Sequence, residues 1–288
     1  MSNTVAGEES YFSCARACWI QRHVLAELKP RIQMFMEAVA DPGSLNIFQY
    51  AQLTAAALEF RPDLIVELGR GYGNSTCAFT EVANRFRNTK VLSLDQNHNW
   101  SGTEARLRAT EPRSWFHPLQ AIETDILTFN FSEALAGASR VLLFWDAHGF
   151  DVANVVLGRV MPELARREHL VVMHDMYDLR YQAKENLSYG DDELWTGGNS
   201  TGRHLMIGNI ASNVEQAVSV LDFSTRNRCP LHTADHSLHT ELSEVEKSEL
   251  TNLWGEMFST YGQWVYFSLC ESAGPLTFPK LKAPEVQS

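Results

Sequence analysis

Short apolar runs alternate with helical stretches through the middle of the chain. Most of these runs are rich in valine, leucine and isoleucine, and they have the length of strands that are buried on both faces. The expected strands are residues 64–68, 90–95, 140–146 and 169–175, with a weaker one in either 115–119 or 121–126. The expected helices between them are residues 74–87, 102–110 and 152–166. This alternation predicts an α/β fold, in which helices cover both faces of a mostly parallel, doubly wound sheet.

The segments outside this core follow other patterns. Further helices are expected at residues 10–40, 46–60, 213–226 and 243–258, with a weak strand at 230–238 and a strong one at 263–269. Residues 176–202 are polar, rich in glycine and dotted with aromatic side chains, which is typical of a long binding loop that follows a strand. We therefore expect three parts: an N-terminal helical extension (1–60), an α/β domain with this insertion (61–275), and a C-terminal tail (276–288).

The composition is that of an ordinary globular protein. The chain has 288 residues, of which 44% are hydrophobic, and a formal net charge of −11, which disfavours nucleic acid and anionic membranes as partners. Its five cysteines are scattered along the chain, as in proteins of a reducing compartment. No segment has the pattern of a signal peptide or the roughly 20 apolar residues that cross a bilayer. A cytoplasmic protein is the expectation.

A glycine-rich turn follows the first expected strand, in the stretch RPDLIVELGRGYGNSTCAF (61–79). Turns of this kind usually receive a phosphate on their backbone N–H groups and on the start of the next helix. Here Glu67 stands two residues before Gly69, and the third glycine, Gly73, comes one place too early for a dinucleotide-binding turn. A carboxylate at this position repels a pyrophosphate but suits an ammonium group or a ribose hydroxyl. The alternative is a tight turn in which Glu67 only caps the helix.

The stretch VELGRGYGNST resembles the first motif, E/D-x-G-x-G-x-G, of the class I S-adenosylmethionine-dependent methyltransferases. That resemblance implies a Rossmann-like sheet with an antiparallel edge strand, and S-adenosylmethionine as the cofactor. Asp95, at the end of the next strand, matches the acid that binds the ribose hydroxyls, and Asp125 matches an acid near the adenine amino group. The cofactor-binding positions implied within the motif are Glu67, Gly69, Gly71, Gly73, Asn74 and Ser75.

Aspartate and histidine gather at the ends of two later strands. Asp146 and His148 follow the run at 140–146, and His174 and Asp175 end the run at 169–175. Because neighbouring parallel strands end at the same edge of a sheet, these side chains could converge beside the glycine turn. They could hold a divalent cation that lowers the pKa of an acceptor hydroxyl. The alternative is a set of polar strand ends that are bonded to their neighbours.

The order of these residues resembles the metal-dependent O-methyltransferases of the cephamycin-biosynthesis and macrolide-sugar type. The resemblance implies Asp146, His174 and Asp175 as metal ligands, with Mg²⁺ or Mn²⁺ as the ion. It also implies His148 as a base, so that the catalytic candidates are His148, Asp146 and His174. His174 departs from the pattern, because those families usually have a carboxylate at this position, and this departure weakens the case for Mg²⁺.

The function expected from these features is S-adenosylmethionine-dependent methyl transfer to a hydroxyl of a small molecule, assisted by a divalent metal. The insertion and the N-terminal helices would select the acceptor, and the amphipathic N-terminal helix could also support a homo-oligomer. Three alternatives remain: a metal-dependent hydrolase that uses the Asp/His cluster, a non-catalytic protein that binds S-adenosylmethionine, and an NAD-linked oxidoreductase.

Overall fold

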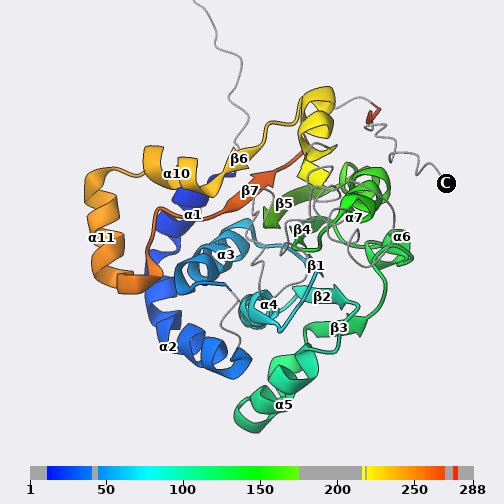
Figure 1. Cartoon of the computed structure of the whole chain (residues 1–288). Coiled ribbons are helices and arrows are strands. Elements are labelled where there is room, and N and C mark those ends of the chain that lie inside the picture. The colour runs from blue at the N-terminus through cyan, green and yellow to red at the C-terminus, as the bar shows by residue number, and fades with distance from the viewer. Residues whose placement is uncertain (1–11, 41–44, 175–215, 218, 270–274, 278–288) are drawn as a thin grey trace, which may run out of the picture.

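The computed structural model of the protein describes residues 12–40, 45–174, 216–217, 219–269 and 275–277. A seven-stranded sheet runs through these residues in the order β3-β2-β1-β4-β5-β7-β6 (Figure 1). The strands are β1 (Leu64–Leu68), β2 (Lys90–Asp95), β3 (Leu119–Glu123), β4 (Arg140–Trp145), β5 (Glu168–His174), β6 (His232–Thr233) and β7 (Trp264–Phe267). The pairs among β1 to β5 are parallel, whereas β7 runs antiparallel to both β5 and β6. The expected Rossmann-like, mostly parallel sheet is confirmed.

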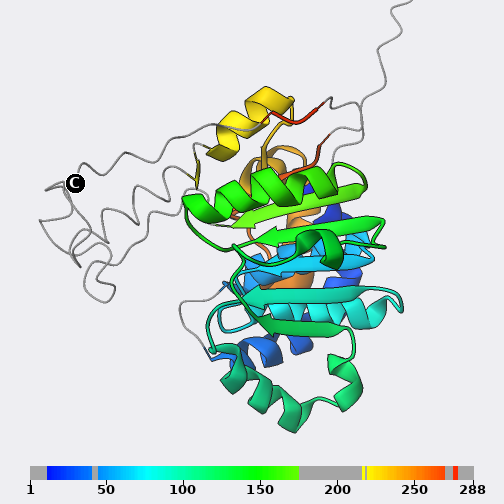
Figure 2. The same ribbon diagram turned by 90° about the vertical axis from the view of Figure 1, so that its right-hand side faces the viewer.

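Helices cover both faces of the sheet, which explains why every residue of β1 is buried (Figures 1 and 2). On the face to the left in Figure 1 lie α1 (Cys14–Ile20), α2 (Arg22–Val39), α3 (Ile47–Phe60), α4 (Asn74–Arg85), α10 (Ala234–Thr240) and α11 (Glu244–Trp254). Towards the right lie α6 (Phe131–Ala134), α7 (Phe150–Val155) and α8 (Met161–Leu164), while α5 (Trp100–Thr110) lies beyond β3. Each face has its own hydrophobic core.

The expected strands largely coincide with the observed ones, but several helices differ from expectation. The single helix expected over 10–40 is two helices that meet at Gln21. The weak strand expected at 230–238 is only the two-residue β6, and α10 starts directly after it. The Thr233 hydroxyl explains this start, because it accepts a hydrogen bond from the His236 backbone N–H and so caps the helix. The insertion 176–202 lies outside the described residues.

The sheet order reverses between β1 and β4. The chain passes outward from β1 to β2 and β3, and then returns to β4 on the other side of β1. Such a reversal leaves a crevice outside the carboxyl ends of the two strands, where α/β proteins bind their ligands. No helix within the described residues is long and apolar enough to cross a membrane.

Candidate functional site

The turn after β1 depends on glycine at three positions. Gly69, Gly71 and Gly73 have φ values of 89°, 53° and 99°, a region that residues with a side chain rarely adopt. A Cβ on Gly69 would lie 2.7 Å from the backbone oxygen of Asp146, and one on Gly73 would lie 2.2 Å from the Trp100 ring. A Cβ on Gly71 would meet nothing within 4 Å. The turn is therefore packed at both ends and open at its middle, and α4 begins directly after it at Asn74.

Glu67 is completely buried beneath this turn. Its Oε2 accepts hydrogen bonds from the Thr76 hydroxyl, at 2.6 Å, and from the Ser93 hydroxyl. Burial raises the pKa of Glu67, and the hydroxyls of Ser75, Ser93 and Thr76 partly oppose this rise. The other oxygen, Oε1, has no hydrogen-bond partner among the described residues. A buried carboxylate oxygen without a donor is costly, and because the whole Glu67 side chain is buried, this oxygen offers no surface to a ligand beside the turn.

Asp95 closes the other side of the turn. Its Oδ2 accepts a hydrogen bond from the Gly71 backbone N–H at 2.7 Å, and its Oδ1 accepts one from the Asn97 N–H at 2.8 Å. The carboxylate thus fixes the open part of the turn while each oxygen keeps further acceptor capacity. Asp125 is half-buried beyond β3 and accepts a hydrogen bond from the Leu127 N–H at 2.8 Å. The role near adenine that the resemblance implies for Asp125 stays a prediction.

Two further residues, Arg70 and Trp100, contribute to the glycine turn and were not predicted from the sequence. Arg70 is buried within the turn, and its guanidinium donates to the backbone oxygen of Ser93 at 2.8 Å. Its positive charge lowers the pKa of Glu67, although burial outweighs this effect. Trp100, the first residue of α5, covers Gly73 with its ring. Neither position is defined by the motif, since Arg70 is one of its variable residues and Trp100 lies outside it.

The Asp/His cluster is only partly visible. His174 Nδ1 lies 3.0 Å from Asp146 Oδ1, so the ends of β4 and β5 meet as expected. The His174 ring packs on Trp264 at 4.5 Å between centroids, and its Nε2 lies 3.5 Å from the amide nitrogen of Gln49 on α3. His148 is exposed, and Asp175 lies outside the described residues. Sequence reasoning missed Gln49, which lies 125 positions before His174 and belongs to no motif.

Asp146 connects this cluster to the glycine turn. Its backbone N–H donates to the Leu68 oxygen at 2.8 Å, and its own backbone oxygen is the atom that excludes a side chain at Gly69. The Asp146 side chain is 24% exposed, whereas that of His174 is only 9% exposed. Of the two, Asp146 is therefore the group that a ligand beside the turn can reach.

Whether the Asp146–His174 pair could bind a metal ion depends on whether a ring nitrogen of His174 is available to it. Both ring nitrogens of His174 face protein groups, Asp146 on one side and Gln49 on the other. A ring nitrogen must present its lone pair to a metal, so one of these contacts would have to break. The described part of the chain contains no group of three His, Cys, Asp or Glu side chains that could hold a metal ion. His174 as placed does not fit the ligand role, and the expected three-residue site stays a prediction because it includes Asp175.

Comparison with known proteins finds only distant likenesses. No protein-family model and no curated protein matches the chain. The SAH-bound methyltransferase PaMTH1 of Podospora anserina is 13% identical, with 92% of this chain and 100% of that chain covered and a TM-score of 0.48. Cofactor-bound Rv0187 from MTB is 9% identical, with coverage of 91% and 99% and a TM-score of 0.47. The plantazolicin methyltransferase BpumL in complex with SAH is 13% identical, with coverage of 86% and 97% and a TM-score of 0.40. Likeness this distant carries no argument about this chain, so a function must be argued from the residues of the site.

Proposed function

We propose that this protein is an S-adenosylmethionine-dependent methyltransferase. The observation that carries the proposal is the open glycine turn after β1, with the Asp95 carboxylate held beside Gly71 by the backbone N–H of that glycine. A phosphate at this turn would meet repulsion from Asp95. A ligand with ribose hydroxyls instead supplies donors to the Asp95 oxygens.

The chain's own residues would hold the cofactor in distinct ways. Asp95 keeps acceptor capacity for ribose hydroxyls, while the buried Glu67 supports the turn by joining Thr76 of α4 to Ser93 of β2. The space above Gly71 admits a ligand close to the backbone. When bound, S-adenosylmethionine supplies a methyl group that a nucleophile can take from the sulfonium, which leaves as a neutral thioether.

The acceptor in this proposal is a hydroxyl of a small molecule. Its oxygen forms a bond to the methyl carbon while the bond from that carbon to sulfur breaks, and its proton passes to a base. Asp146 is the best placed base, because it borders the glycine turn, is partly exposed, and is held by His174. Assistance by a divalent metal is tested separately, because it depends on Asp175.

Calorimetric titration tests the cofactor. We expect SAH and S-adenosylmethionine to bind at about 1 mM or below and NAD to give no binding heat. An absence of binding by both sulfur compounds would overturn the proposal, and binding of NAD alone would favour an oxidoreductase.

A pair of matched glycine variants locates the binding. Gly71 and Gly137 have φ values of 53° and 85°, and a Cβ on either would meet nothing within 4 Å. Gly71→Ala and Gly137→Ala therefore introduce similar backbone strain, but only the first places a methyl group in the proposed cofactor space. We expect Gly71→Ala to weaken SAH binding by about tenfold or more, and Gly137→Ala to leave it within about twofold. Equal affinities of the two variants would place the cofactor elsewhere.

Transfer of a labelled methyl group to hydroxyl-bearing small molecules tests the reaction. Activity that is lost in EDTA and restored by Mg²⁺ or Mn²⁺ would support the metal, and full activity in EDTA would remove it. Binding of SAH without transfer to any acceptor class would favour a non-catalytic binder. Hydrolysis that depends on Asp146 in the absence of cofactor would favour the hydrolase.

A further inference from the structure

A strained residue stands directly before β7. Gln263 has a φ of 60°, in the left-handed region that residues with a side chain rarely adopt. Three other residues besides glycine have a positive φ in the described part of the chain: Ala40, Arg61 and Arg228. Each of these directly follows helical residues, where this conformation ends a helix. Gln263 follows no helix, so its conformation needs another reason.

The start of α10 holds this backbone in place. Asp235, the second residue of α10, accepts a hydrogen bond from the Gly262 N–H at 2.7 Å on one carboxylate oxygen. Its other oxygen accepts one from the Gln263 N–H at 3.1 Å. A Cβ on Gly262 would lie 2.6 Å from the Cβ of Ala234, so the loop is also packed closely against this helix. The surroundings thus impose the strained φ, as is typical of functional sites.

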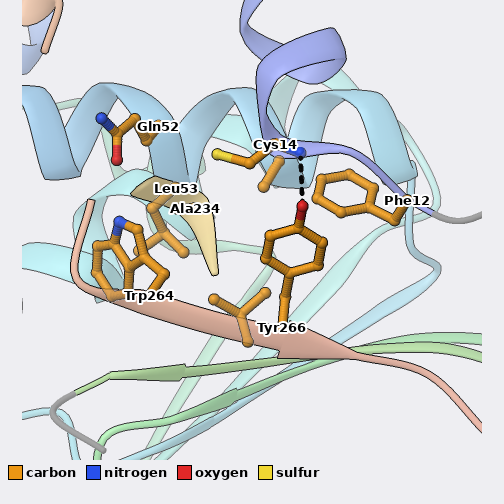
Figure 3. A pocket seen from close by; sticks show the side chains of 9 residues that line it. Phe12, Cys14, Gln52, Leu53, Ala234, Trp264 and Tyr266 are labelled. Atoms are coloured by element: carbon orange, nitrogen blue, oxygen red, sulfur yellow. Dashed lines mark hydrogen bonds between the residues drawn. The ribbon is translucent and has the colours of Figure 1, made fainter. Parts of the chain in front are cut away.

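Helix α3 holds the same loop from another side. The Gln52 amide nitrogen donates to the backbone oxygens of Ser259 and Tyr261, at 3.0 and 2.8 Å. Figure 3 shows Gln52 and Trp264, the first residue of β7, at the same end of a small apolar pocket, opposite Phe12. The loop before β7 is therefore anchored on both α10 and α3.

The Gln263 side chain meets Gln49 of α3. The Gln49 oxygen accepts from the Asn46 backbone N–H at 3.0 Å, and its nitrogen lies 3.3 Å from the Gly262 backbone oxygen. A backbone N–H only donates and a backbone oxygen only accepts, so these two contacts fix which end of the amide is nitrogen. That nitrogen also lies 3.2 Å from Gln263 Oε1 and 3.5 Å from His174 Nε2. A nitrogen with two hydrogens thus faces three groups.

The direction of the bond between His174 and Asp146 follows from their chemistry. An ionised carboxylate only accepts, so His174 Nδ1, at 3.0 Å from Asp146 Oδ1, carries the proton. In the neutral ring the other nitrogen, Nε2, presents a lone pair towards the Gln49 nitrogen. Gln263 Oε1 and His174 Nε2 therefore compete for the hydrogens of one amide, and the contact with His174 is the longest of the three.

We propose that Gln263 is a positioning residue for the Asp146–His174 pair. By accepting one of the two Gln49 N–H groups, it limits the hydrogen bond from Gln49 to His174 and leaves the ring positioned by its shorter bond to Asp146. The strained φ of Gln263 keeps its oxygen on Gln49. The importance of this for Asp146 as a base rests on the proposed methyl transfer, whereas the competition for the amide hydrogens does not.

Nitrogen-15 NMR of the histidine rings tests the competition without any ligand. Spectra are recorded at about pH 8, where an ordinary histidine is neutral, and the His174 signals are assigned by their loss in His174→Asn. In the native protein we expect Nδ1 to have the shift of a protonated nitrogen and Nε2 that of an unprotonated one. In Gln263→Leu the freed N–H of Gln49 turns to His174, so the Nε2 signal should move upfield while it stays in the range of unprotonated nitrogen.

Two glycine variants separate this role from the strain. Gln263→Gly loses the acceptor and also relieves the strain, so it should change the His174 signal as Gln263→Leu does but unfold at a higher urea concentration. Ala40→Gly is the matched control, because it relieves a similar φ of 54° at the end of α2, and it should leave the His174 signals unchanged.

Three results would overturn the proposal. They are an Nε2 signal that is unchanged, or moves downfield, in both Gln263 variants, an equal change in Ala40→Gly, and a Gln263→Gly variant that unfolds at a lower urea concentration than Gln263→Leu. None of these measurements uses a cofactor or an acceptor. A failure of the proposed methyl transfer is thus distinguished from a failure of this positioning role.

Discussion

The ends of β1 and β2 and the ends of β4 and β5 lie at the same edge of the sheet, but they are assembled over very different distances in the chain. Glu67 bonds to Thr76 and Ser93, which lie 9 and 26 positions away, and Asp95 bonds to Gly71, 24 positions away. His174 bonds to Asp146 across 28 positions, but it also contacts Gln49 across 125. The first region is built within one strand–turn–helix–strand unit, whereas the second also depends on α3 and β7.

This difference in assembly implies different roles for the two regions. The hydrogen bonds of Glu67 and Asp95 come from their own neighbours in the chain, so the acids of the glycine turn could be predicted from a short motif. The Asp146–His174 pair takes its surroundings from Gln49 and Trp264, on elements that precede and follow it by long stretches of chain. We therefore expect substitutions in the first region to change cofactor binding, and substitutions in the second to change the rate of transfer.

Asp146→Asn is expected to have the largest effect. Asparagine keeps an oxygen for the hydrogen bond with His174 but is a far weaker base, so the rate of methyl transfer should fall by about 10²- to 10⁴-fold. SAH affinity, measured by calorimetry, should stay within about twofold of the native value. A rate within threefold of native, or a parallel loss of SAH binding, would break the division between the two regions.

Gly69→Ala tests the contact between the regions. An alanine Cβ at this φ of 89° would lie 2.7 Å from the Asp146 backbone oxygen, so strain and overpacking together should destabilise the fold by about 2–4 kcal/mol. Gly137→Ala, at a φ of 85° with no atom within 4 Å, should cost only about 1–2 kcal/mol. Urea denaturation measures both, and equal losses would show that the contact at Gly69 is loose.

Glu67→Gln concerns the glycine turn alone. Burial raises the pKa of Glu67 above its ordinary 4.5, so the folded state binds this proton more tightly than the unfolded chain does. The contribution of Glu67 to stability is fully present below pH 4.5 and is lost as the pH rises through the raised pKa. The variant should therefore gain stability relative to the native protein as the pH rises from 4.5, which urea denaturation at several pH values measures. A difference in stability that does not change with pH would show that the carboxyl has an ordinary pKa.

Gln49→Leu is expected to have the smallest effect on function. The variant loses the contact with His174, at 3.5 Å, together with the hydrogen bonds of the same amide to the Gly262 oxygen, at 3.3 Å, and to Gln263 Oε1, at 3.2 Å. The transfer rate should fall by about 3- to 10-fold and SAH affinity should stay unchanged. Gln49 also belongs to the capping box of α3, so the variant loses some stability for an unrelated reason. Asn46→Ala is the matched control, because it breaks the same capping box without touching His174. If Asn46→Ala slows transfer as much as Gln49→Leu does, the contact between Gln49 and His174 has no role of its own.

The sequence was sufficient to predict most of the sheet. The strands at 64–68 and 90–95 coincide with β1 and β2 because both are short, mostly apolar runs, LIVEL and KVLSLD, of the length of a buried strand. Prediction was weakest around residues 230–240, where Pro230 and the threonines suggested a weak strand and the Thr233 cap starts a helix instead. A local hydrogen bond of this kind outweighs a weak apolar pattern.

The candidate site could be predicted only as far as its local contacts extend. Glu67 was identified from the motif and Asp95 from its place at the end of the next strand. Both bond to residues of the turn or of the helix that follows it, Asp95 to Gly71 and Glu67 to Thr76. That Asp146 and His174 meet was predictable from parallel strand order. The contacts of His174 with Gln49 and Trp264 were not predictable, since they depend on how α3 and β7, which are distant in the sequence, pack against the end of β5.

The approach of Gly69 to Asp146 has a consequence for how such a protein can diversify. It is a contact between two main-chain segments of the same protein. Main-chain atoms are common to all amino acids and have no side-chain rotamers. The spacing between the turn and the end of β4 is thus inherited with the fold and cannot be adjusted one side chain at a time. A lineage that acquires a new ligand must do so through side chains around this fixed interval, while the interval itself stays constant.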